Sequence, residues 1–195
     1  MSPNPQSTSN LSIETTPIEG LLVLKPRVNR DARGFFVESY NRNTFADAGI
    51  TTAFVQDNHS RSSRGTLRGL HFQSGTGQVK LVRCSLGRVW DVAVDIRPGS
   101  PTFGKHHAVE LTPDDCAMFY VPAGFAHGFL ALSDVAELQY KCSTVYDAAI
   151  ESGIMWDDLE LKVAWPLDRV GDAPLLSERD KTNQSFATWK NSVGA

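Results

Sequence analysis

Two histidines that follow glycine-containing stretches are the side chains of this chain best suited to proton transfer or metal binding. His71 lies in the stretch Arg-Gly-Leu-His-Phe-Gln, and His127 ends the stretch Pro-Ala-Gly-Phe-Ala-His. A divalent transition metal needs several convergent imidazole or carboxylate ligands. Gln73 stands where a second histidine would complete a His-x-His pair, and the next glutamate along the chain is Glu110. We therefore predict no metal site, which leaves both imidazoles free to move protons or to hydrogen-bond a substrate.

The charge balance and the cysteine pattern exclude several classes of protein. Lys and Arg number 19 and Asp and Glu number 22, so the net charge is −3. This balance offers no basic field for nucleic acid or an anionic membrane, and no apolar run reaches the ~20 residues of a membrane-spanning helix. The three cysteines are widely separated, which is typical of neither a disulfide scaffold nor a CxxC metal knuckle. We expect a cytoplasmic protein that binds neither nucleic acid nor membrane.

Short apolar runs between turn signals are the elements that must position the two histidines. Such a pattern is typical of a β-sandwich or barrel. Residues 89–96 and 136–143 alternate in polarity and are expected to be strands, the first with one strongly apolar face and the second with Tyr140 pointing inward. His127 follows the Pro-x-Gly-x-x-His spacing of the second cupin motif, whose turn is expected to aim it at the mouth of a barrel. The predicted fold class is all-β, a cupin-type jelly roll with a few short helices.

Helix signals are few. Residues 43–48, followed by Gly49, predict one or two helical turns. Ser177 precedes acidic residues in a pattern typical of a helix start. Phe186 and Trp189 lie close to the C-terminus, and two aromatic side chains there indicate a segment that packs against the fold.

A chain of 195 residues favours a single domain with a substantial core. The sequence contains no internal repeat and no low-complexity linker. We expect a flexible N-terminal tail over residues 1–10, a single jelly-roll domain with a C-terminal arm over residues 11–180, and a C-terminal tail over residues 181–195. The first of these lacks both the basic start and the apolar stretch of a signal peptide.

A series of sequence blocks stands in the order found in one enzyme family. The blocks are residues 31–38, 56–60, 67–73, 80–83, 91–97, 100–104 and 122–129. Together they resemble the dTDP-4-dehydrorhamnose 3,5-epimerase family of metal-free cupins over about residues 18–180. The resemblance implies an enzyme that inverts C3 and C5 of dTDP-4-keto-6-deoxyglucose without a cofactor. The absence of a GxGxxG fingerprint and of a P-loop agrees with this expectation.

The resemblance also implies roles for four side chains. His71 aligns with the base that removes a proton beside the C4 carbonyl, and Asp180 aligns with the carboxylate that pairs with this base and fixes its tautomer. Lys80 aligns with a lysine near the C4 oxygen, where an ammonium group offsets enolate charge. Tyr140 aligns with the general acid on the opposite face, because a phenol with a pKa of about 10 is protonated at neutral pH.

Ten further positions match residues that contact substrate in the family. They are Arg33, Phe36, Glu38, Gln56, Asp57, Asn58, Arg68, His127, Glu151 and Arg179. Guanidinium groups suit diphosphate oxygens, and Phe36 is expected to stack on thymine. Arg179 stands where the family usually has lysine.

Two expectations concern how these residues converge. Strict strand alternation places Arg68 and His71 on opposite faces, so their convergence requires a bulge, a bend or a second subunit. The family forms dimers in which N-terminal strands cross to the neighbour. The resemblance therefore implies a homodimer with strand exchange, in which Arg33 and Glu38 are supplied in trans.

Other functions use much the same residues. An epimerase of a deoxysugar pathway that inverts only C3 or only C5 needs the same acid and base, and a sugar 3,4-ketoisomerase shares the fold. A non-catalytic nucleotide-sugar-binding cupin needs no acid–base pair, which the joint presence of His71, Lys80, Tyr140 and Asp180 argues against. Gln73 and the missing glutamate disfavour a metal-dependent cupin oxygenase.

Overall fold

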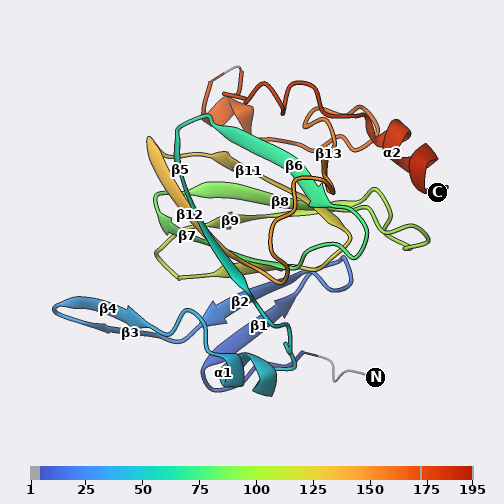
Figure 1. Cartoon of the computed structure of the whole chain (residues 1–195). Helices are drawn as coiled ribbons and strands as arrows, with labels where there is room; N and C mark the ends of the chain where they lie inside the picture. Colours follow the sequence, from blue (N-terminus) through green and yellow to red (C-terminus); the bar gives the residue numbers. More distant parts are fainter. Residues whose placement is uncertain (1–4, 172, 195) are drawn as a thin grey trace.

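Two antiparallel β-sheets packed face to face make up most of the molecule (Figure 1). The computed structural model describes residues 5–171 and 173–194. The six-stranded sheet has the order β1-β2-β10-β7-β12-β5, with β1 Leu11–Thr15, β2 Leu22–Pro26, β10 Met118–Val121, β7 Lys80–Leu86, β12 Val135–Cys142 and β5 Gln56–Ser63. The five-stranded sheet has the order β13-β6-β11-β8-β9, with β13 Glu151–Gly153, β6 Leu67–Gln73, β11 Phe125–Ala131, β8 Val89–Asp95 and β9 His106–Leu111. The predicted all-β jelly roll is confirmed.

Apolar side chains fill three layers of this fold. One cluster lies between the two sheets and includes Phe119 and Leu138. A second cluster lies between the five-stranded sheet and the C-terminal arm, and a third lies under the helix near the N-terminus. Both faces of β8 are therefore buried. The prediction of one apolar face was incomplete, because the C-terminal arm covers the face that carries Val92 and Val94 while Asp91 and Ala93 face the other sheet.

Near the N-terminus, a helix and a hairpin stand beside the sheets. Helix α1 (Arg42–Asp47) forms where it was predicted, and the side chain of Asn41 accepts hydrogen bonds from its first backbone N–H groups. Strands β3 (Val28–Asp31) and β4 (Gly34–Val37) pair with each other and project away from the rest of the chain (Figure 1). Residues 1–4 of the predicted tail lie outside the described residues, whereas the N–H of Gln6 donates to the carbonyl of Ala48 at 2.9 Å.

The C-terminal arm packs across the five-stranded sheet. The prediction of a helix starting at Ser177 is wrong, because residues 178–181 form only a turn. The carboxylate of Asp180 in this turn is hydrogen-bonded to His71. A 3-10 turn (Leu167–Arg169) and helix α2 (Phe186–Val193) are the helical elements of the described part of this arm. Phe186 is buried against the sheet, as its aromatic character predicted. No helix within the described residues is long and apolar enough to cross a membrane.

A bulge in β6 decides which residues of that strand share a face. His71 pairs with His127 of β11, and Arg68 pairs with Phe129, so three steps along β6 match two along β11. Gly69 adopts a φ of +132°, and a Cβ atom there would lie 2.5 Å from the Cα of Gly128. As a result Arg68 and His71 lie on the same face of β6. Of the three expected causes of this convergence, a bulge, a bend or a second subunit, the structure shows the bulge.

Candidate active site

A cavity of about 230 Å³ lies between the sheets and gathers most of the predicted catalytic side chains. Its floor and walls carry His71 of β6, Lys80 of β7 and Tyr140 of β12. Because β6 belongs to the five-stranded sheet and β12 to the six-stranded sheet, His71 and Tyr140 stand on opposite walls. The remaining lining residues are Gln56, Asn58, Phe72, Gln73, Gln78, Tyr146 and Glu151.

His71 and Asp180 form a hydrogen-bonded pair at the edge of this cavity. The Nε2 of His71 lies 2.5 Å from Oδ1 of Asp180, so Nδ1 is the ring nitrogen left for a substrate. The side chain of His71 is 26% exposed and that of Asp180 only 3%. Burial by itself raises the pKa of the Asp180 carboxyl, but hydrogen bonds from His71 and Ser177 outweigh it and hold this pKa below its usual range. The carboxylate therefore stays charged beside the His71 ring.

Burial shifts the pKa values of both Lys80 and Tyr140. Among the described residues, no side chain forms an ion pair or a hydrogen bond with the Lys80 ammonium group, and burial lowers its pKa. Burial also raises the pKa of the Tyr140 hydroxyl, although the positive charge of Arg68 acts in the opposite direction. Tyr140 thus keeps its proton at neutral pH, and Lys80 is available to an oxygen that develops negative charge.

Glu151, Tyr146 and Arg179 form a cluster where the cavity meets solvent. Both the Tyr146 hydroxyl and the Arg179 guanidinium donate to Oε2 of Glu151, the former at 2.5 Å. Glu151 lines the cavity as predicted, and Arg179 reaches it through this contact. Tyr146 was missed by sequence reasoning, because it lies in an irregular segment after β12 where no periodicity marks an inward face.

Two lining glutamines were also missed as site residues. Gln73 exchanges hydrogen bonds with the backbone of Asp147, and Gln78 donates to the carbonyl of Thr144 at 2.9 Å. Both therefore anchor the segment that carries Tyr146 above the cavity. Their only signal in the sequence was the position of Gln73 in place of a metal-binding histidine.

His127 lies within β11 and not at the mouth of the barrel. Its Nε2 is 2.7 Å from Oδ1 of Asp91, and the two residues are 8% and 0% exposed. It stands beside His71 in the sheet register but is absent from the lining of the cavity. Its predicted contact with substrate stays a prediction.

The structure does not bring Arg33, Phe36 and Glu38 to the cavity of their own chain. Arg33 and Phe36 lie on the projecting β3–β4 hairpin, where Arg33 pairs with Asp31 and Phe36 is 70% exposed. Glu38 follows the hairpin and accepts hydrogen bonds from Asn41 and Thr44.

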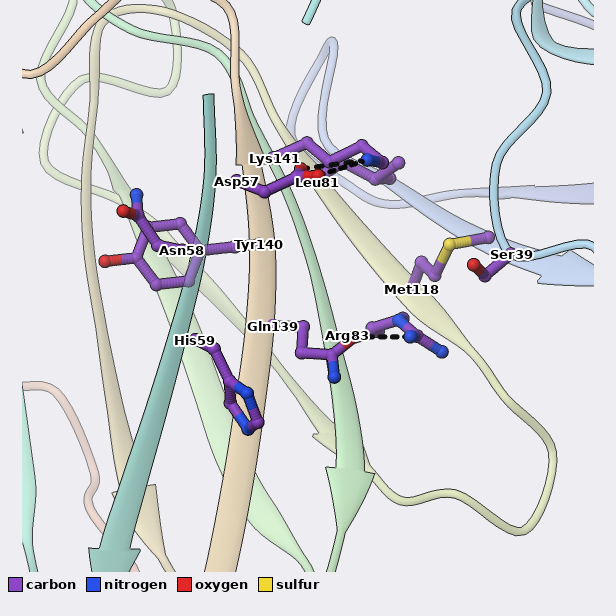
Figure 2. A pocket seen from close by; sticks show the side chains of 10 residues that line it. All are labelled: Ser39, Asp57, Asn58, His59, Leu81, Arg83, Met118, Gln139, Tyr140 and Lys141. Atoms are coloured by element: carbon purple, nitrogen blue, oxygen red, sulfur yellow. Dashed lines mark hydrogen bonds and ion pairs between the residues drawn. The ribbon is translucent and has the colours of Figure 1, made fainter. Parts of the chain in front are cut away.

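Asp57 also points away from the catalytic cavity. It pairs with Lys141 in a separate cavity of about 350 Å³ on the outer side of the six-stranded sheet. Figure 2 shows Asn58 and Tyr140 on one side of their strands and the Asp57–Lys141 pair on the other. The alternation of β5 thus separates Asp57 from its predicted neighbours Gln56 and Asn58.

Comparison with known proteins places this geometry in a family. The model of the dTDP-4-dehydrorhamnose 3,5-epimerase family matches residues 15–188. A relative from Pseudomonas aeruginosa named dTDP-4-dehydrorhamnose 3,5-epimerase is 52% identical over 171 residues, which is 87% of this chain and 93% of that protein.

Solved structures give the same result. The dTDP-6-deoxy-D-glucose-3,5-epimerase of Legionella pneumophila, solved in complex with dTDP-4-keto-L-rhamnose, is 43% identical with a TM-score of 0.86 and covers 91% of this chain and 93% of its own. ChmJ, a 3'-monoepimerase of Streptomyces bikiniensis solved with dTDP-quinovose, is 37% identical with a TM-score of 0.84 and covers 92% and 89% of the two chains.

Proposed function

The chain belongs to the dTDP-4-dehydrorhamnose 3,5-epimerase family, and we propose how its residues convert dTDP-4-keto-6-deoxyglucose into dTDP-4-keto-rhamnose. It is an epimerase, and inversion at C3 and C5 requires a proton to leave one face of the sugar and another to arrive from the opposite face. His71 and Tyr140 stand on opposite walls of one cavity, and this is the observation that carries the proposal.

His71 acts as the base. The C3 and C5 hydrogens flank the C4 carbonyl, so loss of either as a proton gives an enolate. Because Nε2 is bonded to Asp180, Nδ1 takes the proton, and the Asp180 carboxylate stabilises the imidazolium that forms.

Lys80 stabilises the enolate. When the C–H bond breaks, its electron pair moves toward the C4 oxygen, which becomes negatively charged. The Lys80 ammonium group, which has no competing partner among residues 5–171 and 173–194, can turn fully toward that oxygen. Tyr140 then donates its proton to the carbon from the opposite face and regains one from solvent, while His71 releases the proton it took.

We propose that the substrate's diphosphate and thymine are held partly by a second copy of the chain. The exposed Phe36 and Arg33 on a hairpin that projects from its own body are suited to reach a neighbour, as the family resemblance implies. This arrangement makes the protein a homodimer with strand exchange. Within one copy, the proposed contacts are Gln56, Asn58 and Glu151 of the cavity lining, Arg179, which pairs with Glu151, and Arg68, which shares a face of β6 with His71.

The proposed location is the cytoplasm, since all three cysteines are free and buried. The proposed domain boundaries are residues 11–180 for the jelly roll and its arm. The segment of residues 181–195 contributes Phe186 to the packing of that arm.

An isotope-exchange experiment tests the proposed function. The protein is incubated with dTDP-4-keto-6-deoxyglucose in heavy water, and the sugar is examined by NMR. Deuterium is expected at both C3 and C5. Incorporation at one carbon would replace the proposal with a single-centre epimerase, and tight binding with no incorporation would favour a non-catalytic binding protein.

A further inference from the structure

The turn that carries Asp180 is closed by the hydroxyl of Ser177. This hydroxyl accepts the backbone N–H of Asp180 at 3.1 Å and lies 2.8 Å from Oδ2 of the same residue. The incoming N–H occupies a lone pair of Oγ, so the hydroxyl's own proton is free for the carboxylate. The two oxygens of Asp180 are thereby divided, with Oδ1 bonded to His71 and Oδ2 bonded to Ser177.

We infer that Ser177 is a positioning residue for the epimerase reaction, which orients the Asp180 carboxylate and, through it, the His71 ring. This inference rests on the proposed role of His71 as the base. A carboxylate bonded at one oxygen only can rotate about its Cβ–Cγ bond, whereas one bonded at both oxygens is fixed. Asp180 is 2% exposed, so water cannot readily take the place of the serine hydroxyl.

The environment of Asp180 gives the inference a pH signature. His71 of β6 is the titratable group bonded to this carboxylate, and the neighbouring Arg179 is paired with Glu151 of β13. Hydrogen bonds from His71 and Ser177 oppose the effect of burial on the Asp180 pKa. Removal of the hydroxyl therefore raises this pKa, and a neutral Asp180 no longer stabilises the His71 imidazolium.

The test compares Ser177→Ala with Ser177→Thr, which keeps the hydroxyl, in the heavy-water assay. Ser177→Ala is expected to lower kcat by about 10- to 100-fold, the usual effect of losing a hydrogen bond to a charged group. KM should stay within about twofold, because Ser177 does not touch the substrate. The acidic limb of the kcat profile should move to higher pH, and Ser177→Thr should restore kcat to within about threefold of the unmodified protein.

Ser185→Ala is the matched control. Ser185 Oγ accepts the backbone N–H of Thr188 at 3.1 Å, also three residues along the chain, but it has no hydrogen bond to Asp180 or His71. This variant should lower the melting temperature and leave kcat and its pH profile unchanged. Should Ser177→Ala fail to fold, Ser177→Cys keeps the volume with a weaker donor and should show the same shift of the acidic limb.

Two results would overturn the inference. One is a folded Ser177→Ala protein with unchanged kcat and pH profile, and the other is an equal loss in the alanine and threonine variants without a shift of the acidic limb. A His71→Ala protein that still exchanges would instead disprove the proposed base, so the two failures are distinguishable.

Discussion

Two histidine–aspartate pairs stand side by side in the five-stranded sheet, and they differ in exposure. His71 and His127 are direct partners in the register of β6 and β11, and each uses Nε2 to bind a carboxylate. His71 opens onto the cavity and Asp180 reaches it from the C-terminal arm, 109 residues away in sequence. His127 is enclosed with Asp91, which comes from the neighbouring strand β8.

The difference separates the imidazole that we propose as the base from one that is enclosed within the fold. In the open pair both carboxylate oxygens have donors, so the partner of the base is fixed. In the enclosed pair, Oδ2 of Asp91 has no hydrogen-bond partner among the described residues. Within the part of the chain that the structure describes, the Asp91 carboxylate thus has only His127 as a side-chain hydrogen-bond donor, whereas the Asp180 carboxylate has a second donor in Ser177.

The largest expected effect comes from removing the open imidazole. His71→Ala should lower the rate of deuterium incorporation by about 10³- to 10⁴-fold, because it removes the proposed base. Asp180 keeps the hydroxyl of Ser177, so stability should fall by only about 1 kcal/mol. Heavy-water NMR and thermal melting measure the two quantities, and normal turnover would show that the base is a different residue.

Removal of the enclosed imidazole should affect stability more and deuterium exchange less than removal of the open one. His127→Ala leaves the buried carboxylate of Asp91 without its donor and should cost about 3 kcal/mol of stability. The rate of deuterium incorporation by His127→Ala should stay at least about tenfold above that of His71→Ala. Urea unfolding and the same exchange assay test this. A stable His127→Ala protein that has lost exchange would break the comparison and make His127 part of the substrate site.

A third buried carboxylate, without an imidazole, gives the smallest effect and a pH test. Asp95 accepts hydrogen bonds from Arg97, Ser100 and Thr102, which outweigh the effect of burial and lower its pKa to about 2. Since the folded pKa lies below the unfolded value of about 3.9, the stabilisation of about 2 kcal/mol is present above about pH 4 and is lost as the pH falls toward 2.

Asp95→Asn should therefore lower the free energy of unfolding by about 2 kcal/mol at pH 7 and flatten its fall between about pH 4 and 2. Glu14→Gln is the control, because Glu14 is half exposed in its ion pair with Lys25 and should contribute less than about 1 kcal/mol. Equal effects of the two substitutions would mean that burial does not strengthen the Asp95 network.

The sequence predicted much of the fold, and the reasons for its failures are physical. Alternation located β8 and β12, and residues 43–48 with the following Gly49 located α1. The helix expected at Ser177 failed because the same serine and aspartate geometry that caps a helix also closes a turn. Local patterns cannot separate the two when the aspartate is bonded to a histidine far away in the sequence.

The residues of the candidate site likewise include some that the sequence predicted and others that it misplaced or missed. Family resemblance proposed His71, Lys80 and Tyr140, and the structure places all three around one cavity. Asp57 was grouped with its chain neighbours although strand alternation turns it outward. Tyr146 had no signal, since a residue in an irregular segment is directed by its hydrogen bonds and not by a period.

The bulge in β6 also sets how this enzyme tolerates changes in chain length. Gly69 and Gly128 approach so closely that neither can gain a side chain without moving the other. Deletion of Gly69 would remove the extra residue of the bulge, so that two steps along β6 would match two along β11 and Arg68 and His71 would still share a face. Insertion of one residue between Arg68 and His71 beside the retained bulge would instead reverse the phase of the strand and turn the arginine away from the proposed base, although every proposed catalytic residue would still be present in the sequence.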